Sequence, residues 1–207
     1  YRDRGVEVRP GTLVSSVRRS GDEFLVSGKG EEGKPLRVDG VVAGLGIVPN
    51  VSLAESTGLE VDDGIVVDAT FQTGDPRIWA AGDVASFYSP ILDRRVRIEH
   101  EDHANSSGML AGRGMAGEPS SYSHLPLFYS DLFDVSYEAV GVLDAEMETV
   151  EDWIEPHRKG VVHYLQNGLV RGVLLWNVPG KVKEARALIE EERRWMAPDL
   201  RGRIEVA

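Results

Sequence analysis

A stretch of six residues, Ile78-Trp79-Ala80-Ala81-Gly82-Asp83, sets the tightest limit on the fold of this chain. Four apolar residues in succession are typical of a strand that is buried on both faces, as in a sheet covered by helices. The glycine lets the backbone turn sharply, and the aspartate is left at the end of the strand. There its carboxylate can accept hydrogen bonds from ligand hydroxyls, although a solvated turn aspartate gives the same sequence.

A second apolar run, Val41-Val42-Ala43, is followed by Gly44-Leu45-Gly46. We expect a central strand that ends there at a tight turn, and in open α/β sheets ligands bind beyond such carboxyl ends. The segment Asn50–Gly58 then predicts a short helix with Asn50 as its N-cap. Glycine-rich turns separate the other strands predicted in this part of the chain, which are Thr12–Val17, Glu23–Ser27, Leu36–Val38, Gly64–Val67 and Thr70–Thr73.

From about Tyr122 onward the pattern changes to that of antiparallel strands followed by a helix. The predicted strands are Val135–Val142, Val150–Ile154, Gly160–Leu165 and Leu169–Trp176. The last two are joined by Asn167-Gly168, the strongest short signal for a hairpin turn. In Lys181–Met196 the apolar residues lie on or near one face, which predicts an amphipathic helix that covers the sheet.

The composition excludes several classes of function. The 207 residues carry a formal net charge of −11, which argues against a nucleic-acid surface and against docking on anionic lipid. There is no cysteine, so disulfides, thiolate metal sites and thiol nucleophiles are absent. No segment has the pattern of a signal peptide or of a membrane span, and we therefore expect a cytoplasmic protein.

Two motifs resemble those of the FAD-dependent pyridine-nucleotide oxidoreductases. Thr70 followed by Ile78–Asp83 is similar to their second flavin-binding motif, and Gly46-Ile47-Val48-Pro49-Asn50 is similar to the link after their NADH domain. Within that superfamily the sequence is most similar to apoptosis-inducing factor and its prokaryotic relatives. The segment Arg97–Ala104, with Ser107-Gly108 and Leu110–Gly112 after it, resembles that family's segment beside the isoalloxazine ring, and Phe128–Leu132, Tyr137–Gly141 and Leu175–Asn177 continue the resemblance.

The resemblance implies roles for individual residues. Asp83, after Gly82, would bind the ribityl or phosphate side of FAD, while Glu99 and His100 would lie at the junction of flavin and nicotinamide. Tyr129 stands where animal members carry a stacking tryptophan, and Glu138 matches a glutamate that contacts the nicotinamide amide. The implied catalytic residues are Glu99, His100 and Tyr129, and the implied cofactor-binding residues are these three with Gly46, Pro49, Asn50, Gly82, Asp83 and Glu138.

A helix is expected at Ala104–Met115, and its N-terminus would present a favourable dipole to the flavin. Gly46, which lacks a side chain, would leave room for NADH. Each site residue also has a plainer interpretation. Glu99 pairs with Arg97 in an ordinary ion pair, His100 and His103 suggest a metal site that lacks further ligands, and Tyr129 belongs to an aromatic core. No metal is expected.

We expect an α/β fold: a Rossmann-like, three-layer FAD/NAD(P)-binding segment followed by an α+β C-terminal domain with an antiparallel sheet and a terminal helix. The expected domains are the end of an NAD(P)H-binding domain in residues 1–45, the second FAD segment in 46–118, and the C-terminal domain in 122–207. Gly-x-Gly-x-x-Gly occurs twice, at residues 28–33 and 112–117. The first lies between two predicted strands and the second at the end of a predicted helix, whereas each of the two phosphate loops of the family lies between a strand and a helix. We therefore expect this to be the C-terminal half of an enzyme whose upstream half carries both loops.

The resulting prediction is an FAD-dependent NAD(P)H oxidoreductase that passes electrons to a small molecule or a protein, as a monomer or a homodimer. A ferredoxin or rubredoxin reductase is the nearest alternative, although a charge of −11 disfavours an acidic ferredoxin. A non-catalytic interaction module that retains the flavoprotein fold is the second. Flavin bound to the purified protein would separate an enzyme from a module.

Overall fold

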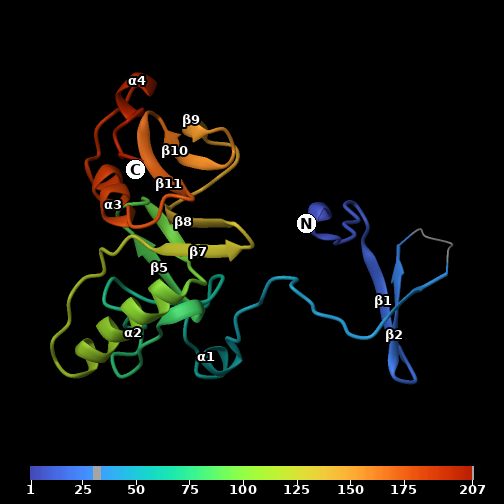
Figure 1. Ribbon diagram of the computed structural model, residues 1–207. Helices are drawn as coiled ribbons and strands as arrows, with labels where there is room; N and C mark the ends of the chain where they lie inside the picture. Colours follow the sequence, from blue (N-terminus) through green and yellow to red (C-terminus); the bar gives the residue numbers. More distant parts are fainter. Residues whose placement is uncertain (30–33, 207) are drawn as a thin grey trace. The chain divides into compact units, whose positions relative to one another are not determined.

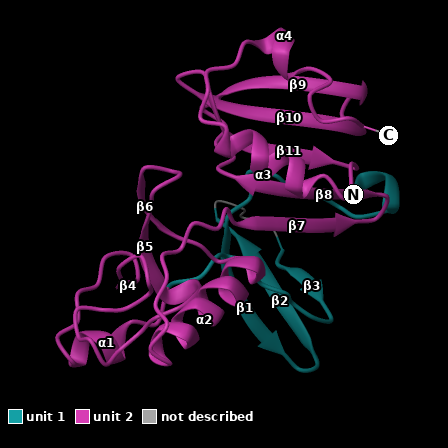
Figure 2. Ribbon diagram, turned by 90° about the vertical axis from the view of Figure 1, so that its left-hand side faces the viewer, with its two compact units in different colours: residues 1–48 teal, residues 49–207 magenta. Residues whose placement is uncertain are grey.

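The computed structural model describes residues 1–29 and 34–206. The chain divides into two compact units, Tyr1–Val48 and Pro49–Ala207 (Figure 2). Among the described residues, no helix has both the length and the apolar composition needed to cross a membrane.

The N-terminal unit is built on a small antiparallel sheet. Its strands are β1 (Val14–Ser20), β2 (Glu23–Gly28) and β3 (Leu36–Val38), in the order β1-β2-β3. A short 3-10 turn, η1 (Arg2–Arg4), precedes them. The β1–β2 turn contains Gly21, whose φ of 66° is the left-handed conformation that glycine adopts without strain. All three strands were predicted, and the first lies two residues further along the chain than expected.

The strand predicted at Val41–Ala43 does not form. These residues have no regular structure, and the side chain of Val42 is 100% exposed. A strand is stabilised by backbone hydrogen bonds to a neighbouring strand and by burial of its side chains. No strand among the described residues pairs with this segment, so its apolar sequence has nothing to pack against.

The second unit begins with helix α1 (Ser52–Ser56), shorter than predicted. Its N-cap is Val51 and not Asn50, because Asn50 directs Oδ1 to the hydroxyl of Ser52, which donates a hydrogen bond to it at 3.0 Å. A three-stranded sheet follows, in the order β4-β5-β6. Strand β4 (Ile65–Val66) pairs in parallel with β5 (Ala85–Ser89), and β5 pairs antiparallel with β6 (Arg94–Arg97). The last two strands were not predicted.

Neither Thr70–Thr73 nor Ile78–Ala81 forms a strand; the two segments meet through one β-bridge, between Gln72 and Trp79. The cause lies in Asp68. Its Oδ1 accepts hydrogen bonds from the backbone N–H and the hydroxyl of Thr70, both at 2.8 Å, and from the N–H of Gln72 at 3.0 Å. Side-chain acceptors of this kind compete with a strand ladder for backbone donors.

Helix α2 (Glu101–Met115) confirms the helix predicted here, although it begins three residues earlier. Its buried residues His103, Ser107 and Ala111 recur every four positions and form one face. The ring of His103 stacks on Phe87, with centroids 5.0 Å apart and an interplanar angle of 10°. Phe71 and Tyr122 complete this aromatic core, at 5.8 Å and 5.5 Å from the same ring.

The C-terminal part contains a five-stranded antiparallel sheet in the order β7-β8-β11-β10-β9 (Figure 1). The strands are β7 (Leu127–Leu132), β8 (Val135–Gly141), β9 (Glu148–Glu155), β10 (Lys159–Gln166) and β11 (Leu169–Trp176). The predicted hairpin is confirmed: Asn167 and Gly168 join β10 to β11 with φ values of 54° and 78°. Positive φ at both central residues is the geometry of the turn that suits twisted strands.

Helix α3 (Val182–Glu190) packs against β8 and β11 and buries Ala185, Leu188 and Ile189 (Figure 1). The prediction of one helix to Met196 was wrong. After Glu190 the chain returns to the hairpin turn, where the N–H of Trp195 donates to the carbonyl of Gly168 at 2.8 Å. This tertiary hydrogen bond replaces the helical one. A short helix, α4 (Ala197–Leu200), follows.

Candidate functional site

The site is built around the turn that carries Gly82 and Asp83, a 3-10 turn η2 (Gly82–Val84) that directly precedes β5 and contacts α2. Gly82 has a φ of 71°. Its N–H donates to Oγ of Ser107 at 2.9 Å, and that buried hydroxyl donates to the carbonyl of His103 at 2.6 Å. The helix therefore holds the turn through a hydrogen bond formed entirely inside the protein. The carboxylate of Asp83 is exposed, and no described residue donates a hydrogen bond to it.

Arg97 lies on the other side of this turn. Its Nη1 donates to the carbonyl of Asp83 at 3.2 Å and to Oε1 of Glu99 at 2.6 Å, and its Nε donates to Oδ1 of Asp63 at 3.2 Å. Burial lowers the pKa of Arg97, but the hydrogen bonds to Glu99 and Asp63 outweigh that effect and raise it. The ion pair of Glu99 with Arg97, which was one of two interpretations of Glu99, is thus present.

His100 is the N-cap residue of α2, so it lies where the helix presents its free N–H groups. Its ring is 4.8 Å from that of Phe128. Burial lowers the pKa of His100, against the opposing effects of Asp102, Asp83 and Glu99. At neutral pH the ring is therefore uncharged. Its Nδ1 is enclosed and has no hydrogen-bond partner among the described residues, which leaves a polar atom unsatisfied beside the turn.

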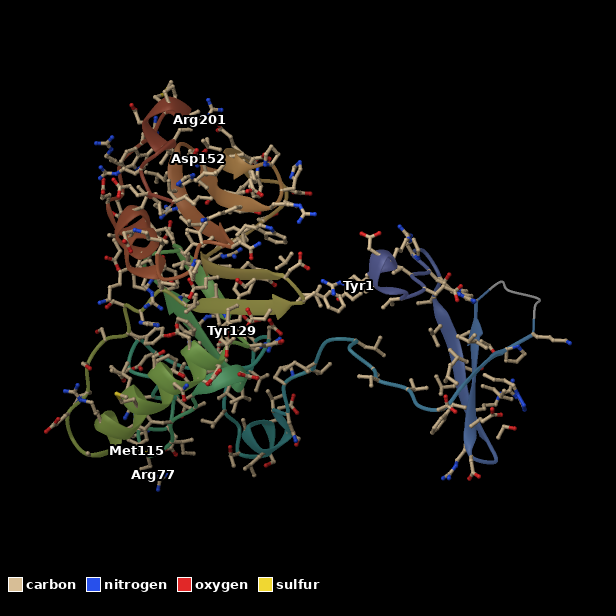
Figure 3. The ribbon with its side chains drawn as sticks, in the orientation of Figure 1. Tyr1, Arg77, Met115, Tyr129, Asp152 and Arg201 are labelled. Atoms are coloured by element: carbon tan, nitrogen blue, oxygen red, sulfur yellow. The ribbon has the colours of Figure 1, made fainter. Side chains whose placement is uncertain are left out.

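Tyr129 lies where β7 approaches α2 (Figure 3). Its hydroxyl donates to Oε2 of Glu101 in the first turn of α2 at 3.2 Å, and this bond raises the pKa of the phenol. The side chain is 60% exposed, so the interpretation of Tyr129 as an aromatic core residue is wrong. Tyr129 pairs with Glu138 across β7 and β8. Oε2 of Glu138 accepts a hydrogen bond from the N–H of Gly180 at 3.3 Å.

A cavity of about 170 Å³ opens beside Tyr129 and Glu138. It is lined by these two residues together with Asp131, Ser136, Tyr137, Leu175, Val178 and Pro179. The lining combines two carboxylates with flat aromatic and apolar surface. The sheet therefore offers both hydrogen-bond acceptors and a ring face on the same side as the N-terminus of α2.

The structure brings together six of the residues proposed from the sequence: Gly82, Asp83, Glu99, His100, Tyr129 and Glu138. Contacts run from Asp83 through Arg97 to Glu99, then along the chain to His100, and from Glu101 through Tyr129 to Glu138. Among the described residues, no hydrogen bond joins Pro49 or Asn50 to this group. Gly46 belongs to the N-terminal unit.

Sequence reasoning missed two residues that shape the site. The sequence indicates an ion pair of Arg97 with Glu99 but not the hydrogen bond by which Arg97 also holds the backbone of Asp83. Ser107 had no assigned role. Its signal in the sequence is its place four residues after His103, which puts both side chains on the same face of a helix. A small hydroxyl on a buried helix face is expected to bond to backbone groups.

A metal site is not supported at these histidines. The part of the chain that the structure describes contains no group of three or more His, Asp or Glu side chains placed to hold a metal ion. His103 instead has its Nδ1 2.9 Å from the hydroxyl of Tyr122, and burial lowers its pKa to about 4. Its role is therefore in the aromatic core behind the site.

The residues fit the ring and ribityl side of a flavin nucleotide. The unpaired carboxylate of Asp83 suits ribityl hydroxyls, and the unsatisfied Nδ1 of His100 and the start of a 15-residue helix suit the polar edge of a ring. A pyrophosphate is held differently, by a glycine-rich turn before a helix. The two Gly-x-Gly-x-x-Gly sequences, residues 28–33 and 112–117, come in chain order between β2 and β3 and at the end of α2, and neither precedes a helix. The site around Asp83 and His100 therefore offers groups for only one side of such a ligand.

The chain matches two known families. Residues 1–108 match the family described as pyridine nucleotide-disulphide oxidoreductase. Residues 111–158 and 152–191 match the family described as apoptosis-inducing factor, mitochondrion-associated, C-term.

Curated proteins and solved structures agree with these matches. Apoptosis-inducing factor 1, mitochondrial, of Dictyostelium discoideum is 37% identical over 91% of this chain and 38% of its own length. Putidaredoxin reductase of Pseudomonas putida is 33% identical over 98% of this chain and 48% of its own. The crystal structure of the covalent putidaredoxin reductase–putidaredoxin complex has a TM-score of 0.83, with 31% identity over 96% of this chain and 48% of that one. The chain thus spans less than half the length of these relatives.

Proposed function

Because the chain belongs to the pyridine nucleotide-disulphide oxidoreductase family, whose members bind FAD and use NAD(P)H, we propose that it is the flavin-ring side of such an enzyme. The enzyme would be an FAD-dependent NAD(P)H oxidoreductase of the apoptosis-inducing-factor type. The observation that carries the proposal is the contact chain from Asp83 through Arg97 to Glu99, placed beside the N-terminus of α2.

Bound FAD would supply the redox chemistry, by accepting a hydride from NAD(P)H and releasing electrons to an acceptor. The residues of this chain bind the cofactors and orient them. Asp83 accepts hydrogen bonds from ribityl hydroxyls, because its carboxylate is exposed and no described residue bonds to it. His100 is uncharged at neutral pH and offers Nδ1 to the ring edge.

The other proposed residues act on the nicotinamide side. Arg97 donates a hydrogen bond to the carboxylate of Glu99 at 2.6 Å and so fixes its position. Tyr129 offers an exposed flat face that shields the ring from water, and its hydroxyl is tied to Glu101. Glu138 accepts hydrogen bonds from an amide such as that of nicotinamide. Pro49 and Asn50 would act in the link between the nucleotide domains, and Gly46 would leave room for the dinucleotide.

The domain organisation expected from the sequence is part of this proposal. Residues 1–45 would end an NAD(P)H-binding domain, residues 46–118 would form the second FAD segment, and residues 122–207 would form a domain able to mediate homodimerisation. The two phosphate-binding glycine loops would come from an upstream half. A cytoplasmic location stays a prediction from the sequence, and one relative carries the name mitochondrial.

Two classes of electron acceptor remain, small molecules and small redox proteins, and each implies a different function. The relatives named putidaredoxin reductase and ferredoxin–NAD(+) reductase component support a small redox protein as acceptor. A net charge of −11 on this chain disfavours an acidic ferredoxin, since like charges slow the encounter. We therefore place a small-molecule acceptor first and a ferredoxin or rubredoxin second. A non-catalytic module is the third alternative.

The test is an anaerobic titration of the full-length protein that contains this chain. We expect the purified protein to retain FAD. We also expect that about one equivalent of NAD(P)H bleaches the absorbance of the bound flavin. A colourless protein that does not oxidise NAD(P)H would remove the enzyme hypothesis and leave the interaction module. Steady-state turnover with a ferredoxin, compared with quinones and oxygen at two salt concentrations, then decides between the acceptor classes.

A further inference from the structure

Arg97 joins three segments that are distant along the chain. Through Nε it bonds to Asp63, which precedes β4, and through Nη1 it bonds to the backbone of Asp83 in η2 and to the side chain of Glu99 after β6. Its side chain is only 11% exposed, whereas those of Asp63 and Glu99 are 73% and 39% exposed. The guanidinium is therefore the most buried of the three charged groups that it joins.

The fold makes room for this side chain at Gly64. A Cβ at that position would lie 2.9 Å from Cδ of Arg97 and 2.7 Å from the carbonyl oxygen of Val84. Gly64 also has a φ of 131°, a conformation that other residues rarely adopt. The path of Arg97 across the start of β4 is thus built into the backbone.

The planar guanidinium suits this task better than an ammonium group does. Nε and Nη1 point in fixed directions toward partners on opposite sides, whereas a lysine has one nitrogen at the end of a flexible chain. Ile98, which follows β6 and stands between Arg97 and Glu99 in the chain, is buried. Since alternate residues of an extended chain point the same way, Arg97 and Glu99 lie on one side of this segment.

We propose that Arg97 is a positioning residue that couples the two halves of the candidate site, the Asp83 turn and the Glu99 carboxylate. The inference rests on the proposed function, because it assigns FAD binding to the first half and reaction with NAD(P)H to the second. Arg97 itself contacts neither cofactor in this proposal. Its loss should therefore affect both FAD affinity and flavin reduction, while loss of Glu99 should affect only the second.

The test compares Arg97→Gln with Arg95→Gln in the full-length flavoprotein. Arg95 is a matched control on the same strand: its Nη1 also donates to backbone carbonyls, at 2.6 Å to Ser86 and 3.5 Å to Val67, and neither hydrogen bond reaches Asp83 or Glu99. We expect Arg97→Gln to slow flavin reduction at saturating NADH about tenfold and to weaken FAD binding several-fold, as for a lost charged hydrogen bond. Arg95→Gln should stay within about twofold of the wild type in both measurements.

A double-mutant cycle separates positioning from a general loss of structure. Glu99→Gln should slow reduction in the wild type but have little further effect in the Arg97→Gln background, because the carboxylate is already unfixed there. Arg97→Lys keeps the charge but loses the two-sided geometry. It should therefore recover less than half of the loss in the logarithm of the flavin-reduction rate that Arg97→Gln causes. Additive effects in the cycle would overturn the proposal, as would equal behaviour of the Arg95 and Arg97 variants.

Asp63→Asn keeps the proposal testable if Arg97→Gln does not fold. Asp63 is exposed and bonds Arg97 from outside the site, so the variant should fold normally and show the same double effect at about two- to threefold. An unchanged rate and affinity in that variant would also count against the proposal. If the wild-type protein holds FAD and reacts with NADH but the Arg97 variants show no coupling, the proposed function stands and the role of Arg97 does not. If the wild-type protein holds no flavin, both the proposed function and the role of Arg97 are contradicted.

Discussion

Asp83 and Glu99 are both acidic residues of one site, but they differ in what holds them. Asp83 is fixed through its backbone and has a free carboxylate, whereas Glu99 is fixed through its carboxylate. This difference explains why they are expected to act on different parts of the dinucleotide pair. It also shows why a shared charge and a shared neighbour, Arg97, do not imply a shared role.

Substitution of the two residues should therefore affect different properties of the enzyme. We expect Glu99→Ala to slow flavin reduction by NADH about tenfold or more while FAD stays bound, and Asp83→Ala to raise the dissociation constant for FAD by a similar factor. Stopped-flow reduction and FAD fluorescence titration of the full-length protein measure the two effects. Unchanged reduction in the Glu99 variant would contradict its place at the ring junction.

Ser107 offers a second test at the residue scale. Ser107→Ala leaves the N–H of Gly82 without its acceptor, which should cost about 1–3 kcal/mol of stability and loosen the Asp83 turn. Ser106→Ala is the control, because that hydroxyl bonds within α2 and to Tyr122 and does not touch the turn. Thermal unfolding and FAD titration should both separate the two variants. Equal losses would show that Ser107 acts only as a helix residue.

At the scale of elements, α2 and β10 each bury a histidine. Burial lowers the pKa of His103 to about 4 and lowers that of His163 as well. Both rings are therefore uncharged in the folded protein at neutral pH, while in the unfolded chain they titrate near pH 6.5. The contribution of His103 to stability is complete above pH 6.5 and is lost as the pH falls from there toward 4, because only the unfolded state then binds protons. The lowered pKa of His163 makes the folded state less stable in acid in the same direction.

We expect the melting temperature to fall between pH 6.5 and 4.5, with each buried histidine contributing up to about 1.4 kcal/mol per pH unit. His103→Phe keeps a ring in the stack with Phe87 and removes one titrating group, so its melting temperature should fall less steeply with acid. Parallel melting curves for the variant and the wild type across this range would show that His103 is already protonated in the folded state.

The elements that could be predicted from the sequence are those fixed by neighbouring residues. The β10–β11 hairpin follows from Asn167-Gly168, whose left-handed conformations determine the turn. The loop around Thr70 to Ala81 could not be predicted, because it depends on the side-chain bonds of Asp68. The early end of α3 depends on a contact between Trp195 and the hairpin turn, which exists only after the sheet has formed.

The same division applies to the site. Asp83, Glu99 and His100 could be proposed because their motif resembles that of a known family. Arg97 and Ser107 were not, since their importance lies in contacts with segments up to 34 residues away. Resemblance identifies residues that a family shares in sequence order, whereas the groups that hold them in place become visible only in the folded chain.

At the scale of the whole molecule, the second unit links the candidate site to the C-terminal sheet. Oδ2 of Asp102, in the first turn of α2, accepts hydrogen bonds from the backbone N–H of Leu127 and from Nη2 of Arg186 on α3, both at 3.1 Å. His124 contributes a third contact at 2.6 Å. The helix beside the proposed flavin ring is thus tied to the domain that carries Tyr129 and Glu138.

The central claim is that these residues form one side of a flavin site and that the phosphate-binding side lies outside them. The most direct measurement is a titration of FAD into the 207-residue chain, alone and mixed with the upstream half that carries the glycine loops. Most of the affinity for a dinucleotide comes from pyrophosphate contacts at such loops. We expect no saturable binding and no NADH oxidation by the chain alone, and recovery of both in the mixture. Stoichiometric FAD binding by the chain alone would contradict the account.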